Sequence, residues 1–470
     1  MQTRKKHMIS KNQEISVSIV DYTREGEGIG KWEGVPFFIK DTVIGDQVEA
    51  VVTKVKKNYG YARLKKVLSP SADRIEAPCP VARQCGGCRI QQMAYDKQVA
   101  FKRSQVINCL ERIGGFESVE GITEEALGMD HPWHYRNKAQ YPVGYDRQGN
   151  IIAGFYAGRT HHIIPNEDCL IQAKGNDRIL RVILDHMENH HIPPYDEKTG
   201  RGLVRHIYTR IGFATGQIMV CLVLKGQAEE FEDLGGLADQ LAGIPGMTSI
   251  IVNVNKEKTN RILGDSCLTV WGKDEIEDEI DGVRFLIGPR SFYQVNPVQT
   301  RVLYSKALEY AGLTGGETVW DLYCGIGTIS LFLARRAGKV TGVEIVPEAI
   351  HDARRNARLN HIDNVEFHVG KAEEVAPVLC EDQGGKPDVI VVDPPRKGCD
   401  KTLLDTILSL GPDRVVYVSC DPGTLARDLR ILCQDSYHLD KVAVVDQFCH
   451  SCHVEAVTLL ERVSSQKADS

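Results

Sequence analysis

The hydrophobic residues follow two different patterns along the chain, one in the N-terminal part and another in the C-terminal part. Near the N-terminus Ile15, Val17 and Ile19 alternate with polar residues, and glycine-rich turns separate two further runs at 35–39 and 48–52. A period of two is typical of strands with one buried face. Several such strands joined by glycine turns favour a small closed barrel. We therefore predict a β-barrel at the start of the chain.

The pattern changes after Asn296-Pro297, a polar N-cap followed by proline at the first position of a predicted helix. Before this point we expect a helix from about residue 94 to 113 and strands between 135–164 and 200–290. After it, short continuous apolar runs alternate with helix-like segments, as expected for parallel strands buried on both faces. The runs are 318–323, 339–344, 365–369, 388–393 and 414–420. The C-terminal part is predicted to be a doubly wound, Rossmann-like α/β domain.

The length of 470 residues agrees with about three domains. We predict an α/β protein with an OB-like barrel at 1–70, a central α+β domain at 71–285 and a catalytic domain at 286–470.

Composition narrows the class of protein. Hydrophobic residues make up 42% and charged residues 26%, and no apolar run approaches the ~20 residues needed to cross a bilayer. The basic start is followed by no hydrophobic signal core, so we expect a cytoplasmic protein without a membrane partner, most simply a monomer. Fourteen cysteines in such a protein indicate metal binding, catalysis or burial rather than a disulfide scaffold.

Net charge is −6, but residues 1–70 hold thirteen Lys and Arg against eight Asp and Glu. Three of these lysines, Lys54, Lys56 and Lys57, precede Tyr59 and Tyr61. Positive charge with interleaved aromatic rings indicates RNA binding by the barrel.

A candidate nucleoside site lies between the first C-terminal strand and the next helix. The segment Asp321-Leu-Tyr-Cys-Gly325-Ile-Gly327 lets a ligand approach the backbone, and Glu344 closes the following strand, where a carboxylate can take ribose hydroxyls. The third glycine of the dinucleotide fingerprint is absent, because position 330 is serine. The pattern favours one nucleoside, with S-adenosylmethionine as the natural candidate.

Two further motifs end the fourth and fifth of these strands. Asp393-Pro-Pro-Arg396 offers a rigid floor for a flat base, and its arginine disfavours methylation of an exocyclic amine, for which an aromatic residue is typical. Ser419-Cys420-Asp-Pro presents a thiol at a strand end. If the two strands are neighbours, Cys420 lies beside Asp393 and is a candidate nucleophile.

A cysteine group, Cys79, Cys85, Cys88 and the distant Cys169, indicates an inorganic centre. Four thiolates suit zinc or an iron–sulfur cluster, and spacing alone does not separate the two. The spacing is not that of radical S-adenosylmethionine enzymes.

Together these motifs resemble those of bacterial RNA (uracil-5)-methyltransferases, in particular the branch that modifies 23S ribosomal RNA. The resemblance covers nearly the whole chain. It rests on a TRAM-like barrel at about 8–67, the four cysteines, Ser291-Phe-Tyr-Gln294-Val-Asn296, Asp321-Leu-Tyr323, Asp393-Pro-Pro-Arg, Ser419-Cys420-Asp-Pro and His453-Val-Glu455.

The resemblance implies a role for each matching position. S-adenosylmethionine would be bound by Gln294, Tyr323, Glu344 and Asp393, with Gly325 in the glycine loop. Cys420 would be the nucleophile and Glu455 the base. Cys79, Cys85, Cys88 and Cys169 would hold a [4Fe–4S] cluster.

The implied reaction is methylation of carbon 5 of a uridine in 23S ribosomal RNA, in a single-stranded or loop region, through a covalent bond from Cys420 to carbon 6. One departure is visible, because Cys449 and Cys452 stand where proline and histidine are usual. Two alternatives remain at this point: an iron–sulfur redox protein with a nucleotide domain, and an RNA-binding module without catalysis.

Overall fold

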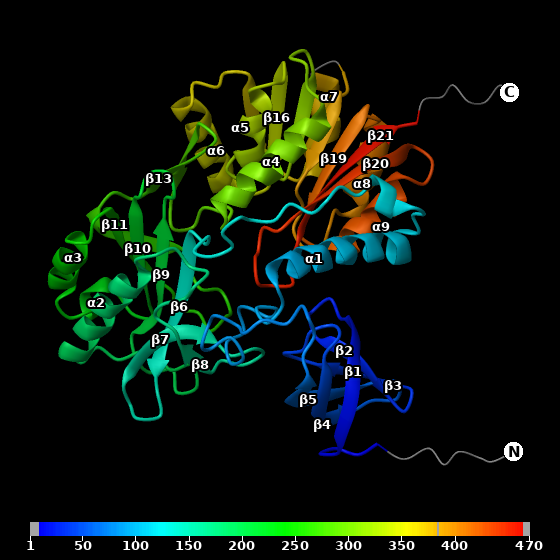
Figure 1. Cartoon of the computed structure of the whole chain (residues 1–470). Helices are drawn as coiled ribbons and strands as arrows, with labels where there is room; N and C mark the ends of the chain where they lie inside the picture. The colour runs from blue at the N-terminus through cyan, green and yellow to red at the C-terminus, as the bar shows by residue number, and fades with distance from the viewer. Residues whose placement is uncertain (1–8, 383–384, 464–470) are drawn as a thin grey trace, which may run out of the picture. The chain divides into compact units, whose positions relative to one another are not determined.

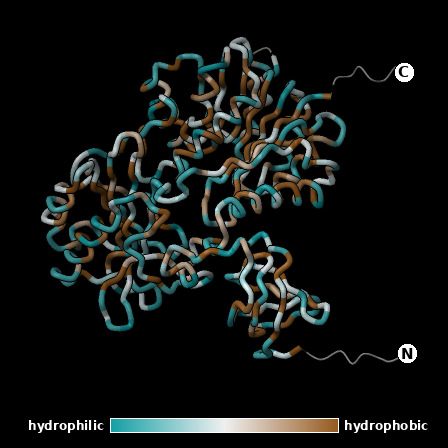
Figure 2. The backbone as a smooth tube through the Cα atoms, in the orientation of Figure 1, coloured by the Kyte–Doolittle hydropathy of each residue, from teal (hydrophilic) through white to brown (hydrophobic). Residues whose placement is uncertain are grey.

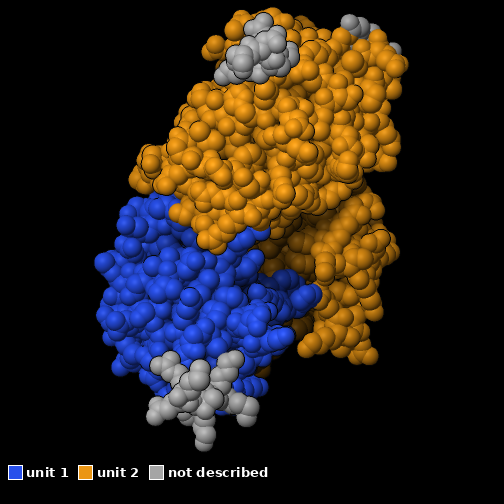
Figure 3. Space-filling view, turned by 90° about the vertical axis from the view of Figure 1, so that its right-hand side faces the viewer, with its two compact units in different colours: residues 1–102, 156–161, 448–452 blue, residues 103–155, 162–447, 453–470 orange. Residues whose placement is uncertain are grey.

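The computed structural model describes residues 9–382 and 385–463. It divides into two compact units, coloured separately in Figure 3. Unit 1 contains residues 1–102, 156–161 and 448–452, and unit 2 contains residues 103–155, 162–447 and 453–470. Two short excursions of the chain therefore belong to unit 1, although their flanking strands belong to unit 2. Each unit is described by itself.

The predicted N-terminal barrel is confirmed as a closed sheet with strand order β1-β2-β3-β5-β4, drawn in blue in Figure 1. Its strands are β1 (Glu14–Tyr22), β2 (Gly28–Trp32), β3 (Val35–Ile39), β4 (Gln47–Val55) and β5 (Gly60–Ser69). The alternating Ile15, Val17 and Ile19 are buried in its core. Closure leaves the small sheet without a free edge, which is the physical advantage of a barrel.

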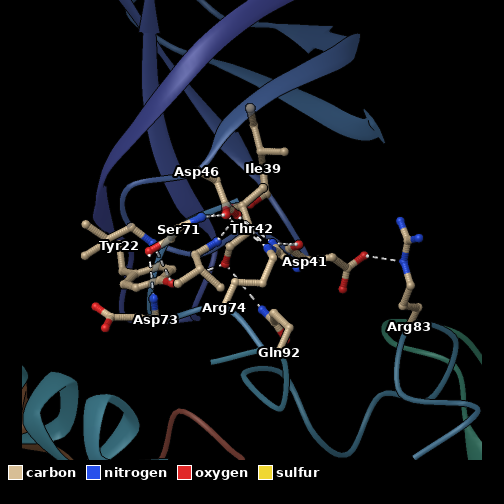
Figure 4. A network of polar contacts seen from close by, with 12 residues as sticks. Tyr22, Ile39, Asp41, Thr42, Asp46, Ser71, Asp73, Arg74, Arg83 and Gln92 are labelled. Atoms are coloured by element: carbon tan, nitrogen blue, oxygen red, sulfur yellow. Dashed lines mark hydrogen bonds and ion pairs between the residues drawn. The ribbon is translucent and has the colours of Figure 1, made fainter. Parts of the chain in front are cut away.

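A polar network fixes the segment after the barrel to its base (Figure 4). The fully buried Asp46 carboxylate accepts hydrogen bonds from the Arg74 guanidinium, and it also accepts from the backbone N–H of Ser71 at 2.9 Å. Arg74 in turn donates to the carbonyl of Asp41 at 2.8 Å, and the Asp41 carboxylate lies 3.6 Å from Arg83. A buried charge requires such partners, so this network holds residues 71–83 against the barrel.

The helix expected at about 94–113 is α1 (Tyr95–Cys109), which continues as a π-helical turn at Leu110–Gly114. Its Lys102 side chain is fully buried, and the Nζ atom donates to the carbonyl of Phe448 at 2.9 Å. Within unit 1, the 448–452 excursion is therefore anchored to the start of this helix.

Unit 2 contains a mixed seven-stranded sheet with the order β12-β11-β10-β9-β6-β7-β8. Its strands are β6 (Lys138–Tyr145), β7 (Ile151–Tyr156), β8 (Ile163–Pro165), β9 (Val204–Ile211), β10 (Ile218–Leu224), β11 (Met247–Val254) and β12 (Ser266–Gly272). The expectation of strands throughout 200–290 is incomplete, because β10 and β11 are parallel and are joined through α3 (Leu234–Ala242). A parallel pair needs such a crossover. Helix α2 (Asn176–Asn189) packs on the same sheet.

The predicted doubly wound domain is confirmed as a second seven-stranded sheet, with the order β17-β16-β15-β18-β19-β21-β20. Its strands are β15 (Thr318–Leu322), β16 (Lys339–Glu344), β17 (Val365–Val369), β18 (Val389–Val392), β19 (Arg414–Ser419), β20 (Tyr437–Val445) and β21 (Glu455–Arg462). The first five are parallel, and β21 runs antiparallel between β19 and β20. A hairpin, β13 (Ile276–Ile280) and β14 (Val283–Ile287), precedes this domain.

Helices cover both faces of this sheet. They are α4 (Pro297–Ala311), α5 (Thr328–Ala334), α6 (Pro347–Leu359), α7 (Ala372–Asp382), α8 (Lys401–Leu410) and α9 (Pro422–Leu432). Along β18, Val389 and Val391 join one core cluster, whereas Ile390 and Val392 join the other. Figure 2 shows the hydrophobic stretches that run along the strands. In the described part of the chain, no helix has the length and apolar character needed to cross a membrane.

Candidate active site at the strand ends

Strand register brings the predicted catalytic residues together at the carboxyl ends of the parallel strands. Leu322 of β15 pairs with Val392 of β18, and Val392 pairs with Tyr417 of β19. The next residues along the first two strands, Tyr323 and Asp393, therefore leave the sheet side by side. Ligand sites of open α/β sheets lie at this edge.

The antiparallel strand β21 contributes Glu455 from the opposite direction. Ser419 pairs with Ala456, so one step further Cys420 and Glu455 lie opposite each other. Asp421 caps α9 immediately afterwards, because its carboxylate accepts from the backbone N–H groups of Gly423 at 2.8 Å and Thr424 at 3.0 Å. The cap and Pro422 end the strand sharply and fix the backbone that carries the thiol.

The thiol and the carboxyl group share one electrostatic environment. Burial raises the pKa of Cys420 to about 12, and the carboxylates of Glu455 and Asp393 act in the same direction, whereas Arg396 acts against them. Burial and the charge of Asp393 also raise the pKa of Glu455 well above its usual range, again opposed by Arg396. The thiol is therefore protonated when no ligand is bound, and a cation that enters the site would favour the thiolate.

Arg396 is a residue to which the sequence motifs assign no role. It belongs to the loop 393–399, whose backbone is held by α9: the Thr424 hydroxyl donates to the Arg396 carbonyl at 3.2 Å, and Arg427 donates to the Lys397 carbonyl at 2.9 Å. The buried Asp428 accepts from the Cys399 backbone N–H at 2.8 Å. In the sequence, Arg396 is visible only as the last residue of the Asp393-Pro-Pro-Arg396 motif. The folded loop brings its guanidinium near Cys420 and Glu455.

The glycine loop after β15 adopts left-handed backbone conformations. Gly325 has φ +56° and Gly327 has φ +82°, and Tyr323 also lies in the left-handed region at φ +76°. The Gly325 backbone N–H donates to Glu344 at 3.3 Å, so the loop and the acidic end of β16 meet directly. A non-glycine residue with positive φ is uncommon and marks a conformation that the surrounding structure enforces.

Two carboxyl groups, the fully buried Asp321 and the half-buried Asp393, lie near the carboxyl ends of the neighbouring strands β15 and β18. Burial raises the pKa of Asp321 to about 7, with Glu344 acting in the same direction and the Ser330 hydroxyl, which donates to Asp321, acting against it. Burial and the charge of Asp321 likewise raise the pKa of Asp393 to about 7. Crowded carboxylates in a buried site favour a positively charged ligand, because such a ligand relieves their mutual repulsion.

Gln294 lies just before Asn296, which caps α4 as predicted by accepting from the Gln299 backbone N–H at 3.2 Å. The Gln294 carbonyl accepts a hydrogen bond from the Asn137 side chain at 2.9 Å, and the Gln294 side chain is largely buried. The cofactor-binding role of Gln294 stays a prediction.

A second residue outside the predicted set is Tyr304 of α4. Its buried hydroxyl donates to Thr328 at 2.9 Å, at the start of α5. Burial raises its pKa, and the nearby carboxylates of Asp393, Asp321 and Glu455 act in the same direction. Because Tyr304 lies in the middle of α4 and outside every motif, the sequence did not indicate that it is close to these carboxylates.

A cationic cluster lies next to the Gln294 segment. Lys138 of β6 pairs with Arg210 of β9, and burial lowers the pKa of Lys138 to about 8, aided by Arg210 and Arg136. Arg210 also donates to the Ser291 carbonyl. Asn137, between Arg136 and Lys138, donates to the Gln294 carbonyl, so the cationic cluster is joined to the segment that carries Gln294.

The four predicted cluster cysteines fall in both units. Cys79, Cys85 and Cys88 share one loop of unit 1, in which the Gly87 backbone N–H donates to Cys85 Sγ at 3.4 Å and Cys79 is close enough to raise the pKa of Cys85 after the larger effect of burial. Cys169 is half-buried in unit 2, close enough to Tyr141 to affect the pKa of its hydroxyl. The close groups of candidate ligand atoms in the described residues do not include these cysteines, so the metal or cluster site stays a prediction.

Comparison with known proteins agrees with this geometry. A family model described as tRNA (uracil-5-)-methyltransferase matches residues 275–463, and a TRAM domain model matches residues 9–65. An RNA methyltransferase of Halalkalibacterium halodurans, named as uncharacterized, is 51% identical over 96% of this chain and 98% of its own length. This chain belongs to the RNA (uracil-5-)-methyltransferase family.

Two further relatives support the assignment. An RNA methyltransferase of Clostridium tetani is 46% identical over 98% of each chain. The crystal structure of the Pyrococcus abyssi tRNA (uracil-54, C5)-methyltransferase in complex with S-adenosyl-L-homocysteine superposes with a TM-score of 0.76 and 29% identity, over 95% of this chain and all of the other. The methyltransferase described here is therefore an S-adenosylmethionine-dependent enzyme with an N-terminal TRAM barrel. The resemblance to RNA (uracil-5)-methyltransferases is confirmed, whereas the 23S ribosomal RNA branch stays a prediction.

Proposed function

We propose that this methyltransferase transfers a methyl group from S-adenosylmethionine to carbon 5 of a uridine in 23S ribosomal RNA, through a covalent bond between Cys420 and carbon 6. The observation that carries the proposal is the meeting of Cys420, Glu455, Asp393 and Arg396 at one sheet edge. Carbon 5 of uracil is a poor nucleophile, so a thiolate that adds to carbon 6 is the chemical solution that such a site offers.

The proposed reaction uses the Cys420 thiolate, a base and the methyl donor. The Cys420 thiolate forms a bond to carbon 6, and the electron pair of the carbon 5–carbon 6 double bond moves to give an enolate. Bound S-adenosylmethionine supplies an electrophilic methyl group and a positive charge. Carbon 5 takes the methyl group as the methyl–sulfur bond of the donor breaks, which leaves S-adenosylhomocysteine. A base must then remove the carbon 5 proton so that the Cys420–carbon 6 bond can break and release the thiolate.

Glu455 is proposed to be that base. A buried carboxylate with a raised pKa is a stronger proton acceptor than an exposed one, provided that it is ionised when it acts. Arg396 and the positive charge of the methyl donor would favour its ionised form, as they would favour the Cys420 thiolate.

For the methyl donor, we propose binding by the glycine loop at Tyr323 and Gly325, by Glu344, by Asp393 and by Gln294. The carboxylates suit both its ribose hydroxyls and its sulfonium charge. The fit rests on the crowded acidic groups and on the left-handed backbone of the loop.

For the RNA, we propose that the TRAM barrel binds the strand and that Arg136, Lys138 and Arg210 receive the segment carrying the target uridine. The target base must leave its stack before Cys420 can reach it, which favours a loop or single-stranded region. The proposed division of labour follows the predicted domains 1–70, 71–285 and 286–470. We expect the enzyme to act in the cytoplasm as a monomer.

We further propose that Cys79, Cys85, Cys88 and Cys169 hold a [4Fe–4S] cluster with a structural role, since four ligands from segments far apart in the sequence would tie those segments together. Anaerobically purified protein should contain about four iron and four sulfide per chain. The Cys88→Ser variant should lose most of this iron and unfold at a lower temperature, whereas Cys267→Ser, at an exposed position of β12, should change neither quantity. Zinc at one equivalent without sulfide would contradict the cluster.

The test of the substrate uses protein with radiolabelled S-adenosylmethionine and two RNAs, 23S ribosomal RNA and total transfer RNA, both taken from cells that lack this enzyme. We expect 5-methyluridine in ribosomal RNA only, which nuclease digestion and mass spectrometry would locate. Label in transfer RNA alone would overturn the choice of RNA but retain the reaction. Label in neither RNA would overturn the proposed function.

A further inference from the structure

The outer face of the TRAM barrel carries three aromatic rings in mutual contact: Phe38, Tyr59 and Tyr61. Their ring centroids are 5.3 Å apart for Phe38–Tyr59, 5.6 Å for Phe38–Tyr61 and 5.7 Å for Tyr59–Tyr61. All three side chains are half-buried, so part of each ring faces solvent. We call these three residues the aromatic surface.

Local sequence and packing explain why the rings gather outside the barrel. Phe38 and Tyr61 are direct partners in the parallel pairing of β3 and β5. Gly60 lies on the inner side between the two tyrosines, where an added Cβ would come within 2.3 Å of the fully buried Phe37 ring. Since side chains alternate along a strand, the inward glycine directs Tyr59 and Tyr61 outward.

A basic turn borders the aromatic surface. Lys54 near the end of β4 is exposed, as are Lys56 and Lys57 in the β4–β5 connection. This connection closes through a hydrogen bond from the Lys56 backbone N–H to the Tyr59 carbonyl at 2.8 Å. The six basic residues between positions 50 and 72 are accompanied by no Asp or Glu. Exposed cations beside exposed rings match the phosphates and bases of a nucleic acid strand.

A cation from a distant part of the sequence completes the surface. Residues 156–161 belong to unit 1, and their Ala157 forms a β-bridge with Cys85 while the Gly86 backbone N–H donates to the Tyr156 carbonyl at 3.0 Å. The exposed Arg159 at the tip of this turn lies near Tyr61. The pKa of Tyr61 is raised by desolvation, by Tyr59 and by the buried Glu27, and Arg159 acts in the opposite direction.

We propose that Phe38, Tyr59 and Tyr61, with Arg159 at their edge, bind unpaired bases of the substrate RNA by stacking, while Lys54, Lys56 and Lys57 bind its phosphates. The occupant is a single-stranded stretch of RNA, because bases in a duplex have their faces covered by neighbouring pairs. This inference rests on the proposed function, in that the substrate is RNA, and adds which surface selects unpaired strands.

The test measures binding of a fluorescein-labelled oligouridylate of twelve nucleotides to the full-length enzyme by anisotropy, at several salt concentrations. Tyr59→Leu/Tyr61→Leu should weaken binding at least about tenfold with the salt dependence unchanged, because stacking is lost and charge is kept. Tyr59→Phe/Tyr61→Phe keeps both rings and should bind as the wild type does. Tyr145→Leu, at an exposed position of unit 2, is the matched control and should also bind normally.

The phosphate half of the proposal is tested separately. Lys54→Gln/Lys56→Gln should reduce the slope of log affinity against log salt by about 1.4, from roughly 0.7 per lost phosphate contact on a single strand. The leucine variants should not weaken binding to the same oligonucleotide paired with oligoadenylate.

Three results would overturn the inference: wild-type affinity in Tyr59→Leu/Tyr61→Leu, equal loss in the phenylalanine variant, or no binding of oligouridylate by the wild type. Methylation of ribosomal RNA is measured in the same preparations. If methylation proceeds while the leucine variant binds oligouridylate normally, only the surface assignment fails. If no RNA is methylated, the proposed function fails by itself.

Discussion

The strand-end site and the aromatic surface are opposite kinds of binding surface. The strand-end site combines the buried Asp321 and Glu455 with the half-buried Asp393, and the pKa values of all three are raised. The aromatic surface lies half-buried on a barrel, and the lysines that border it are exposed, so their charge stays hydrated. The first suits a small cation and covalent chemistry, whereas the second suits a long polyanion.

The comparison shows that burial determines how strongly a charged group responds to a change in its surroundings. A buried group responds strongly to the arrival or loss of one charge, because little water screens it. An exposed lysine contributes to binding mainly through released counterions, and its individual effect is small. Substitutions in the strand-end site should therefore change turnover and ligand affinity more than substitutions of exposed lysines on the barrel.

Cys420→Ala should abolish turnover, with a loss above about 10³-fold, because it removes the thiol that is proposed to form the bond to carbon 6. The variant should also form no covalent complex with RNA on a denaturing gel. Binding of S-adenosylhomocysteine should be retained, which shows that the fold is intact. Turnover within tenfold of the wild type would contradict nucleophilic catalysis by Cys420.

Glu455→Gln should lower turnover by about 10²- to 10⁴-fold, the usual contribution of a general base. Unlike Cys420→Ala, it should accumulate a methyl-labelled covalent complex with RNA, since elimination of the thiolate needs the carbon 5 proton to be removed first. The measurement is a denaturing gel with labelled S-adenosylmethionine. Rapid turnover without a complex would direct attention to Asp446 or His453 as the base.

Affinity for S-adenosylmethionine should rise about tenfold between pH 6 and pH 8, because a carboxyl group with a pKa of about 7 becomes ionised over this range and attracts the sulfonium. S-adenosylhomocysteine, which lacks that charge, should show a much smaller change. Calorimetric titrations of Asp393→Asn should lose most of the difference between the two ligands. An identical pH profile for both ligands would contradict electrostatic recognition of the sulfonium.

Asp393 should lower the stability of the ligand-free enzyme near neutral pH. Its folded-state pKa of about 7 lies above the ordinary value of about 3.9, so the folded state favours the protonated form, and the stability that this adds at low pH is lost as pH rises toward 7. Asp393→Asn should therefore raise the melting temperature by a few degrees at pH 8 and by less at pH 5. The opposite order in thermal melts would contradict the raised pKa.

The smallest effect is expected for Lys65→Gln. This lysine already contacts Glu14 and Glu49, each at 2.7 Å, so its charge is balanced by the protein. Its substitution should leave the salt dependence of oligouridylate binding nearly unchanged, in contrast to Lys54→Gln/Lys56→Gln. A decrease as large as that of the double variant would extend the RNA-binding surface to this side of the barrel.

The sequence by itself determined the class of fold and most of the candidate chemistry. Alternation at Ile15, Val17 and Ile19 marked the barrel, and continuous apolar runs marked the parallel strands, because burial on one or two faces leaves different periods in a sequence. The Asn296 cap, the glycine loop after Asp321 and the cysteine before a proline turn were visible because each follows from local backbone geometry.

Only the tertiary structure decided which distant residues meet. The pairing of Ser419 with Ala456 sets Glu455 against Cys420, and the bridge from Cys85 to Ala157 carries Arg159 to the rings of the barrel. Arg396 and Tyr304 acquire their places near the carboxylates in the same way. Such contacts depend on register and packing between elements far apart in sequence, which no local pattern of residues encodes.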